Sequence, residues 1–487
     1  MRETNIKDKA ALGFAWLTGE RLGNLLSDFL ISVLLARLLG PTDFGLIAMV
    51  SVFIALLRPF TEAGLGSALL RKKDATHHDY ATVFWSNLAL SVGTYIVLYV
   101  SAPWVFRFYS EPSLTQLIRV LGSVLILTAL GMVQNIKLTK EMDFRRISLL
   151  SLASNIFSGI VGLYMAYLGW GYWALVVRQL LNGIGTTVLY WLWGTWSPTF
   201  TFSKASFRDF FGFGSKLLLA NLLDTGFKNI YPLLIGKFYS AASLGYYNRA
   251  SSLKDIPQAL ITQISGRVTY PILIEVQEDR EKLTGIYRRL VQVISFLYFP
   301  VMMGLMGLSK CVVLVLLSEK WAQTTPLLQG LAFAGLLYPI HSLNLNVLTL
   351  KKRSDIFLYL EIIKKALTVL VVLITFRWGL MAMIYGQIVL SFLSLFINAH
   401  YTGKFIGYGF YEQVKDLVPN FIPAFLMGAL LMGGIEALDT YTWWSLTFWL
   451  ILGACLYLGL TAAFNRKGLL YLYDFSLQKY KTVKAQF

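Results

Sequence analysis

Apolar stretches long enough to cross a bilayer as α-helices recur along the whole of this 487-residue chain. The mean hydropathy is +0.60, 56% of the residues are hydrophobic and only 14% are charged. The connections between the stretches are short, which leaves no room for a soluble catalytic domain. This pattern predicts an all-α polytopic membrane protein.

The apolar stretches predict about fourteen transmembrane helices. We place them at 11–39, 44–70, 80–102, 114–136, 147–168, 172–195, 207–236, 244–274, 290–309, 323–350, 356–376, 380–400, 417–436 and 443–465. An even number of spans puts both termini on the same side of the membrane. The N-terminal segment MRETNIKDKA is followed by a charged helix without a small-residue cleavage site, so we interpret it as a retained end and not as a signal peptide.

The basic residues alternate with these spans as the positive-inside rule requires. With the N-terminus in the cytoplasm, the inside segments carry 26 Lys and Arg and the outside segments carry 5. The formal net charge of +17 therefore reflects topology and indicates no nucleic-acid partner. We expect both termini in the cytoplasm, with the basic tail at 466–487 lying on anionic inner-leaflet lipid.

The residues that commonly bind metals or nucleotides show no organised pattern. Cys311 and Cys455 lie in apolar context, and the four histidines lack metal-ligand spacing. No stretch matches the phosphate-binding loop G-x-x-x-x-G-K-[ST]. We expect no metal, no cofactor and no nucleotide-driven step.

The chain resembles itself at an offset of 200 to 210 residues. LARLLGPTDFG at 35–45 aligns with IGKFYSAASLG at 235–245, and W-G-x-x-A-x4-Q occurs at 170–179 and again at 378–387. Leu138-Thr139 aligns with Leu348-Thr349. Three matches in order predict two homologous six-helix bundles of the same orientation. We assign them to 1–195 and 196–402, followed by an extra helix pair at 403–465.

Polar residues occupy equivalent positions in the first two helices of each half. Arg21, Asn24 and Asp28 share one helix face, and Asn221, Asp224 and Lys228 follow 200 residues later. Because ionisable groups inside a membrane are costly, they predict a hydrated cavity between the halves. The alternative is that they only pair within the bundles and hold helices together. Lys and Arg outnumber Asp and Glu within the spans, however, which favours an anionic cargo.

Two groups of candidate site residues follow from this pattern. We expect substrate contacts from Arg21, Asn24, Arg58, Lys228, Arg249, Lys254 and Gln258. We expect ion coupling or gating from Asp28, Glu62 and Asp224, with Asp28 and Lys228 pairing in one transport state.

Three segments carry a family resemblance: ARLLGPTDFG at 36–45, EAGLGSALLRKKD at 62–74 and SEKWAQTTPLL at 318–328. They resemble the multidrug/oligosaccharidyl-lipid/polysaccharide exporter superfamily, and within it the Wzx-like flippases of O-antigen, colanic acid and teichuronic acid synthesis. The resemblance implies a non-enzymatic flippase of the bacterial cytoplasmic membrane that moves an undecaprenyl-pyrophosphate-linked oligosaccharide outward. It also implies that Arg21, Arg58 and Arg249 contact the pyrophosphate.

The resemblance implies membrane lipids and polysaccharide polymerase machinery as further partners. Two other functions are kept as alternatives. An ion-coupled drug or cation antiporter of the same superfamily would need a net acidic cavity. A membrane polysaccharide polymerase would need carboxylate or histidine clusters in an aqueous loop.

Overall fold

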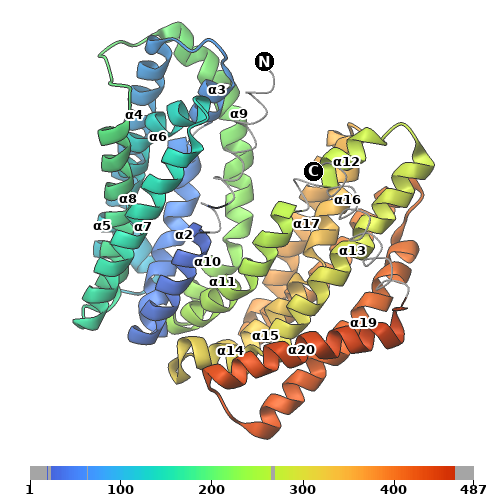
Figure 1. Ribbon diagram of the computed structural model, residues 1–487. Coiled ribbons are helices and arrows are strands. Elements are labelled where there is room, and N and C mark those ends of the chain that lie inside the picture. Colours follow the sequence, from blue (N-terminus) through green and yellow to red (C-terminus); the bar gives the residue numbers. More distant parts are fainter. Residues whose placement is uncertain (1–18, 20–22, 63, 265–268, 467–487) are drawn as a thin grey trace, which may run out of the picture. The chain divides into compact units, whose positions relative to one another are not determined.

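The structure is a computed structural model that describes residues 19, 23–62, 64–264 and 269–466 (Figure 1). All regular secondary structure within these ranges is helical, which confirms the predicted all-α class. The chain divides into two compact units, Met1–Gly245 and Tyr246–Phe487.

The first unit begins with a helix at 23–38 and continues through nine further helices in its described part. These are α2 (Pro41–Glu62), α3 (Leu65–Arg71), α4 (His77–Tyr109), α5 (Leu114–Leu121), α6 (Val124–Lys140), α7 (Phe144–Tyr167), α8 (Tyr172–Trp193), α9 (Lys204–Lys228) and α10 (Ile230–Phe238). The boundary between the units falls inside α11 (Ala241–Ile264).

The second unit contains the rest of α11 and all later elements. The α-helices are α12 (Tyr270–Glu275), α13 (Arg280–Gly307), α14 (Ser309–Val312), α15 (Thr324–Gly335), α16 (Tyr338–Leu350), α17 (Ser354–Thr375), α18 (Leu380–Ile406), α19 (Phe410–Leu438) and α20 (Trp443–Phe464). A π-helical turn at Val313–Leu317 and short 3₁₀ turns at Glu319–Trp321 and Phe376–Trp378 connect them.

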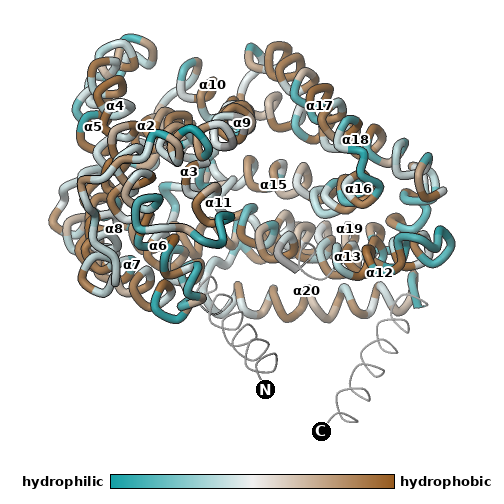
Figure 2. Tube along the Cα trace, turned by 90° about the horizontal axis from the view of Figure 1, so that it is seen from above, coloured by the Kyte–Doolittle hydropathy of each residue, from teal (hydrophilic) through white to brown (hydrophobic). Residues whose placement is uncertain are grey.

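Nine helical segments in the described part of the chain are long and apolar enough to cross a membrane. Figure 2 shows hydrophobic residues along most helices and hydrophilic residues gathered in connecting segments. Four other helices of 22 to 25 residues, α8, α9, α11 and α17, are also long enough to cross but are not among these nine. Helices α8, α9 and α11 carry many of the polar side chains considered below.

Some predicted spans are interrupted within the structure. The stretch at 44–70 forms α2 and α3, which meet at Gly64, where φ is 66°. A Cβ at this position would lie 2.6 Å from the Cα of Gly214 on α9. Glycine therefore allows both the left-handed turn and the close approach of α9.

The two halves of the chain share turn conformations at the offsets found in the sequence. The helix breaks at 39–40 and at 239–240 have the same form. Met142 and Lys352, which are 210 residues apart, both adopt positive φ, at 56° and 55°.

The aligned glycines of the repeat also have matching surroundings. A Cβ on Gly45 would overlap the carbonyl oxygen of Ala241, and a Cβ on Gly245 would overlap that of Pro41. The starts of α2 and α11 therefore cross with their backbones in close contact.

The first compact unit extends past residue 195, where we placed the end of the first bundle. Helix α9 packs on α2, α3 and α4, and α10 packs on α2 and α4. These contacts assign both helices to the first unit, although the sequence repeat begins again with them.

The last two helices are fixed to the second unit by polar contacts. Helix α19 packs along α13, where the Arg288 guanidinium pairs with Asp416 at 2.6 Å. The Asn344 side chain on α16 donates to Gln413 on α19 at 3.0 Å. Such contacts join helices in lipid, where apolar packing gives little preference for one partner.

Candidate functional site: a polar cavity in the first unit

Helix α8 carries three polar residues on one face near the middle of its length. Arg178, Gln179 and Asn182 are spaced i, i+1 and i+4, so their side chains lie close together on the helix surface. Helix α8 packs against α2, α6 and α7. An arginine surrounded by helices of this apolarity requires polar partners or water.

The first of two cavities beside this face has a volume of about 310 Å³. Its polar lining consists of Asp28, Ser51, Arg178, Gln179 and Asn182. The helix at 23–38 supplies Asp28, and α2 supplies Ser51. Side chains from three helices thus converge here.

An ion pair joins the two charged residues of this cavity. A terminal nitrogen (Nη2) of Arg178 lies 2.6 Å from Oδ1 of Asp28 and 3.4 Å from Oδ1 of Asn155. The Arg178 side chain is 21% exposed and that of Asp28 is 58% exposed. The stem of Arg178 lies close to α7, because a Cβ on Gly162 would be 2.9 Å from the Arg178 Cβ.

Two buried donors beside this pair have no hydrogen-bond acceptor among the described residues. They are Nε of Arg178 and Nδ2 of Asn155. A buried donor without an acceptor costs free energy, so water or a ligand oxygen is needed to satisfy them. These two donors are therefore able to hydrogen-bond to an additional anionic or carbonyl oxygen.

The second cavity has a volume of about 490 Å³ and shares Gln179 and Asn182 with the first. Arg58 of α2 and Asn135 of α6 also line it. Asn135 donates to the Tyr190 hydroxyl at 3.0 Å, which fixes the amide against α8. Arg58 is exposed.

Among the lining residues that the structure describes, the two cavities carry two arginines and one carboxylate. Arg58 and Arg178 give an excess of one positive charge over Asp28, with neutral amides between them. Guanidinium groups bind phosphate oxygens in a bidentate manner. The described residues include no group of three or more His, Cys, Asp or Glu that could hold a metal. The arrangement is suited to binding an anion inside the membrane.

The structure places Asp28 and Arg58 at these cavities, and it places Asn24, Asp224 and Lys228 elsewhere. Asn24 donates to the Ser151 hydroxyl at 3.3 Å. Lys228 pairs with Asp224 at 2.7 Å within α9. The expected Asp28–Lys228 pair does not form in this structure, because each residue has a different partner. Arg21 and the side chain of Glu62 lie outside what the structure describes.

The predicted residues of the second unit lie on α11. Arg249 is only 7% exposed, and its guanidinium carbon (Cζ) is 5.5 Å from the centre of the Trp321 ring. Lys254 pairs with Asp255 at 2.9 Å, and Ser251 donates to the same carboxylate at 3.2 Å. The backbone carbonyl of Gln258 accepts from Thr262 at 2.7 Å.

Sequence analysis missed Arg178, Asn182 and Asn155. The signal that could have identified Arg178 was its charge, because it lies well inside the predicted apolar span at 172–195. The predicted residues came instead from the first two helices of each half, where polar residues recur at the repeat offset. At the offset of 208 that aligns this helix, Arg178 corresponds to Gly386, which carries no side chain.

The sequence matches a family model over more than half of its length. Residues 34–326 match the family described as "Polysaccharide biosynthesis protein". Among curated relatives, the teichuronic acid biosynthesis protein TuaB of Bacillus subtilis (strain 168) is 30% identical over 300 residues. This match covers 61% of this chain and 62% of that protein. The lipopolysaccharide biosynthesis protein WzxC of Escherichia coli (strain K12) is 24% identical over 417 residues, covering 82% of this chain and 83% of that protein.

Solved structures show the fold. The lipid II flippase MurJ in an inward closed conformation has a TM-score of 0.71 at 16% identity and covers 94% of this chain and 99% of that chain. An inward-facing MATE-family multidrug resistance transporter has a TM-score of 0.58, and the match covers 86% of this chain and 96% of that transporter. The family match, the relatives and this fold confirm the resemblance found in the sequence. The chain belongs to the polysaccharide biosynthesis protein family, and its fold is that of the lipid II flippase MurJ and of a MATE-family transporter.

Proposed function

We propose that the protein is a flippase that moves an undecaprenyl-pyrophosphate-linked oligosaccharide from the inner to the outer leaflet of the bacterial cytoplasmic membrane. The observation that carries this proposal is the presence of two cavities among apolar helices, one lined by Arg58 and the other by Arg178, which share Gln179 and Asn182. A pyrophosphate is the anion expected when the cargo of a polysaccharide transporter is linked to lipid. The likeness to a lipid II flippase supports a lipid-linked cargo.

The transport mechanism in this proposal is alternating access by two six-helix repeats, with the C-terminal helix pair attached to the second. The matching turns near residues 40 and 240, and at Met142 and Lys352, support this repeat. The pyrophosphate and sugars occupy the polar cavity while the polyprenyl chain stays in lipid. Asp28, Glu62 and Asp224 remain the proposed coupling or gating carboxylates, and Arg21 and Arg249 remain proposed cargo contacts.

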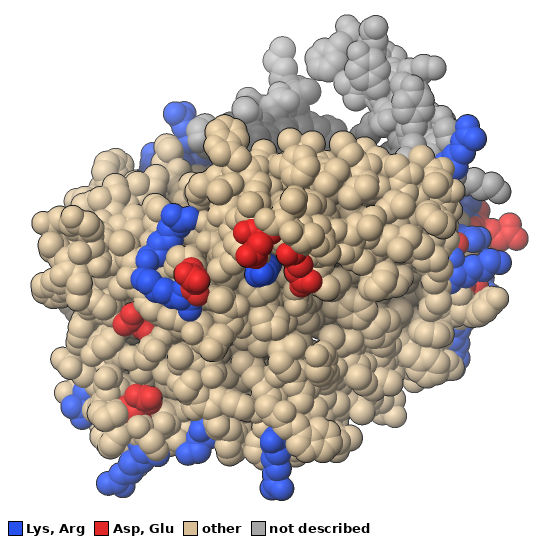
Figure 3. All heavy atoms as spheres, turned by 90° about the horizontal axis from the view of Figure 1, so that it is seen from below, with Lys and Arg blue, Asp and Glu red and all other residues tan. Residues whose placement is uncertain are grey.

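The proposed topology has fourteen spans and two cytoplasmic termini. In Figure 3, most of the surface in view belongs to residues other than Lys, Arg, Asp and Glu. A surface with few basic residues is expected on the outer side of the membrane.

Reporter fusions test this topology. We expect cytoplasmic readings after Thr76, Arg146, Glu278 and Arg353, and external readings near Asp43 and Asp439. The expectation follows from the basic residues beside the first four positions. Two contradictory readings would exclude the fourteen-span arrangement.

Depletion of the protein tests the function. We expect a lipid-linked oligosaccharide to accumulate in the inner leaflet and surface polysaccharide to fall, because the step between synthesis and polymerisation is blocked. Mass spectrometry of extracted lipids, with and without an impermeant probe of the outer leaflet, measures both. Unchanged lipid-linked intermediates together with increased sensitivity to cationic drugs would support the antiporter alternative instead.

A further inference from the structure

A long apolar groove lies in the first unit, apart from the polar cavities. Its volume is about 880 Å³. Helices α2, α4 and α9 form its walls together with the segment before α9. The lining residues are Leu57, Phe60, Trp85, Ser86, Ala89, Leu90, Gly93, Thr94, Val97, Phe202 and Phe207.

The groove runs along α4 for part of the length of that helix. It extends from Trp85, two turns into the helix, to Val97. At 1.5 Å per residue this distance is about 18 Å. One leaflet contributes about 15 Å to the hydrocarbon core of a bilayer. The groove therefore matches the length of one acyl chain, whereas a polyprenyl chain is several times longer.

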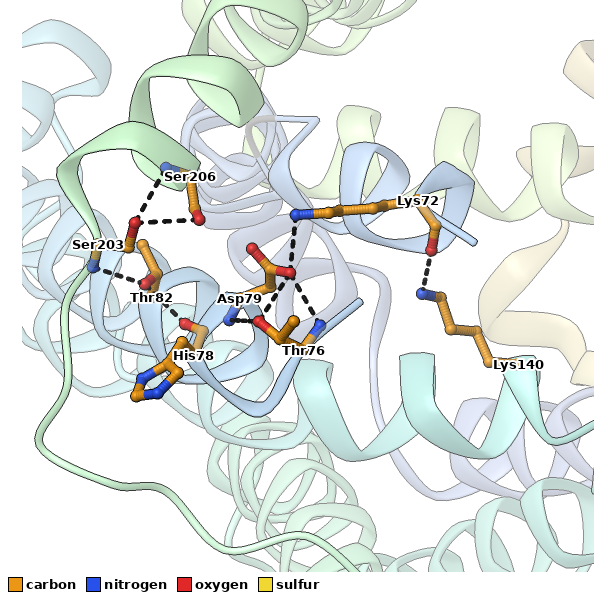
Figure 4. Close-up of polar contacts among 8 residues, drawn as sticks. All are labelled: Lys72, Thr76, His78, Asp79, Thr82, Lys140, Ser203 and Ser206. Atoms are coloured by element: carbon orange, nitrogen blue, oxygen red, sulfur yellow. Dashed lines mark hydrogen bonds and ion pairs between the residues drawn. The ribbon is translucent and has the colours of Figure 1, made fainter. Parts of the chain in front are cut away.

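We call the Trp85 end of the groove its mouth. Hydrogen bonds and an aromatic stack fix the walls of the groove at this end. The Trp85 indole N–H donates to the Thr199 carbonyl at 2.9 Å, and its ring stacks on Phe200 at 5.0 Å between centroids. The backbone N–H of Ser203 donates to the Thr82 hydroxyl at 3.0 Å, which joins the starts of α4 and α9 (Figure 4). The groove is thus preformed at this end.

Two basic residues lie near the mouth of the groove. Lys204 begins α9 and lies one turn before Phe207 on the same face, and Arg208 follows Phe207. Both are exposed, and neither has a carboxylate within ion-pair distance among the described residues. The acidic Asp79 nearby is already paired with Lys72 at 2.8 Å (Figure 4). Asp209, also exposed, lies on a different side of α9 from Phe207.

We propose that this groove binds one acyl chain of an anionic phospholipid, whose phosphate is held by Lys204 and Arg208. The apolar walls can bury the acyl chain, and the two basic side chains near the mouth can bind the negatively charged headgroup. The proposal does not depend on the proposed function. Binding of the lipid is measured without reference to export, so the two proposals can fail separately.

Filling the groove tests the proposal. A Cβ on Gly93 meets no atom within 4 Å, so Gly93→Trp places its ring in the groove without a backbone clash. Gly459→Trp on α20 is the matched control, because Gly459 is also helical, exposed and free of neighbours within 4 Å. Phosphatidylglycerol and phosphatidylcholine are titrated against the full-length protein, and bound lipid is counted by native mass spectrometry.

We expect the unaltered protein and Gly459→Trp to bind phosphatidylglycerol equally and Gly93→Trp to lose at least about tenfold in affinity. Lys204→Gln with Arg208→Gln should reduce the preference for phosphatidylglycerol by roughly fivefold per cation. This second variant changes only exposed side chains, so it tests the proposal even if Gly93→Trp fails to fold.

Three outcomes would overturn the proposal. The first is unchanged binding by Gly93→Trp. The second is equal affinity of the unaltered protein for the two phospholipids, which would indicate an apolar groove without headgroup recognition. The third is displacement of phosphatidylglycerol by undecaprenyl phosphate at lower concentration than by phosphatidylglycerol itself, which would assign the groove to the cargo.

Discussion

Alanine in place of Arg178 should abolish export and also lower the amount of folded protein. The substitution removes the partner that lies 2.6 Å from Asp28 and leaves a carboxylate among apolar helices. Leaving one member of a fully buried pair uncompensated costs about 3–5 kcal/mol. This range is an upper bound here, because the Asp28 side chain is 58% exposed. Membrane abundance and surface polysaccharide, measured in the same cells, report the two effects.

Replacing both members of the ion pair by neutral residues distinguishes the structural role of Arg178 from its role in transport. Asp28→Asn combined with Arg178→Gln keeps hydrogen-bonding groups at both positions and leaves no lone charge. We expect it to restore abundance but not full export, because the guanidinium of Arg178 no longer contacts the cargo phosphate and only that of Arg58 remains. Recovery of export in this double variant would show that the ion pair only holds helices together. Arg377→Ala, at an exposed arginine of the second unit, is the control for a general effect of losing an arginine.

The helices could be predicted from the sequence because apolarity along the chain determines which segments enter a membrane. Every predicted stretch from 44–70 onward is mostly helical in its described residues. The break at Gly64 was not predicted, because it depends on the approach of Gly214 from a helix about 150 residues later. Such contacts follow from tertiary packing, and they leave no periodic signal in the local sequence.

The candidate site could be predicted only in part. Asp28 and Arg58 were found because ionisable residues inside apolar spans are rare and costly. Arg178 was not predicted because it lies on the sixth span, outside the first two helices of each half, and its aligned position is Gly386. The partners of the cations were also not predicted. Lys228 can reach Asp224 within its own helix, and the sequence alone does not rank that local pair against a distant one.

Alanine in place of Arg58 should reduce export strongly while leaving abundance close to normal. Arg58 is exposed at the larger cavity, so its loss creates no packing defect comparable to that of a buried side chain. Its backbone carbonyl, which accepts from the Thr61 hydroxyl at 2.9 Å, is retained in the variant. A hydrogen bond to a charged group contributes about 1.5–3 kcal/mol. At about 1.4 kcal/mol per factor of ten, loss of one such contact corresponds to roughly 10- to 150-fold weaker cargo binding.

Lysine at position 58 provides the graded comparison. Arg58→Lys keeps the positive charge but loses the planar group that contacts two phosphate oxygens, so export should be intermediate between the unaltered protein and Arg58→Ala. Arg58→Gln keeps polarity without charge and should resemble alanine. The order Arg, Lys, then Gln and Ala indicates recognition of an anion, and it is measured as surface polysaccharide per unit of membrane protein. If Gln supports as much export as Lys, charge at this position is irrelevant, and Arg58 would then serve only to hydrate the cavity.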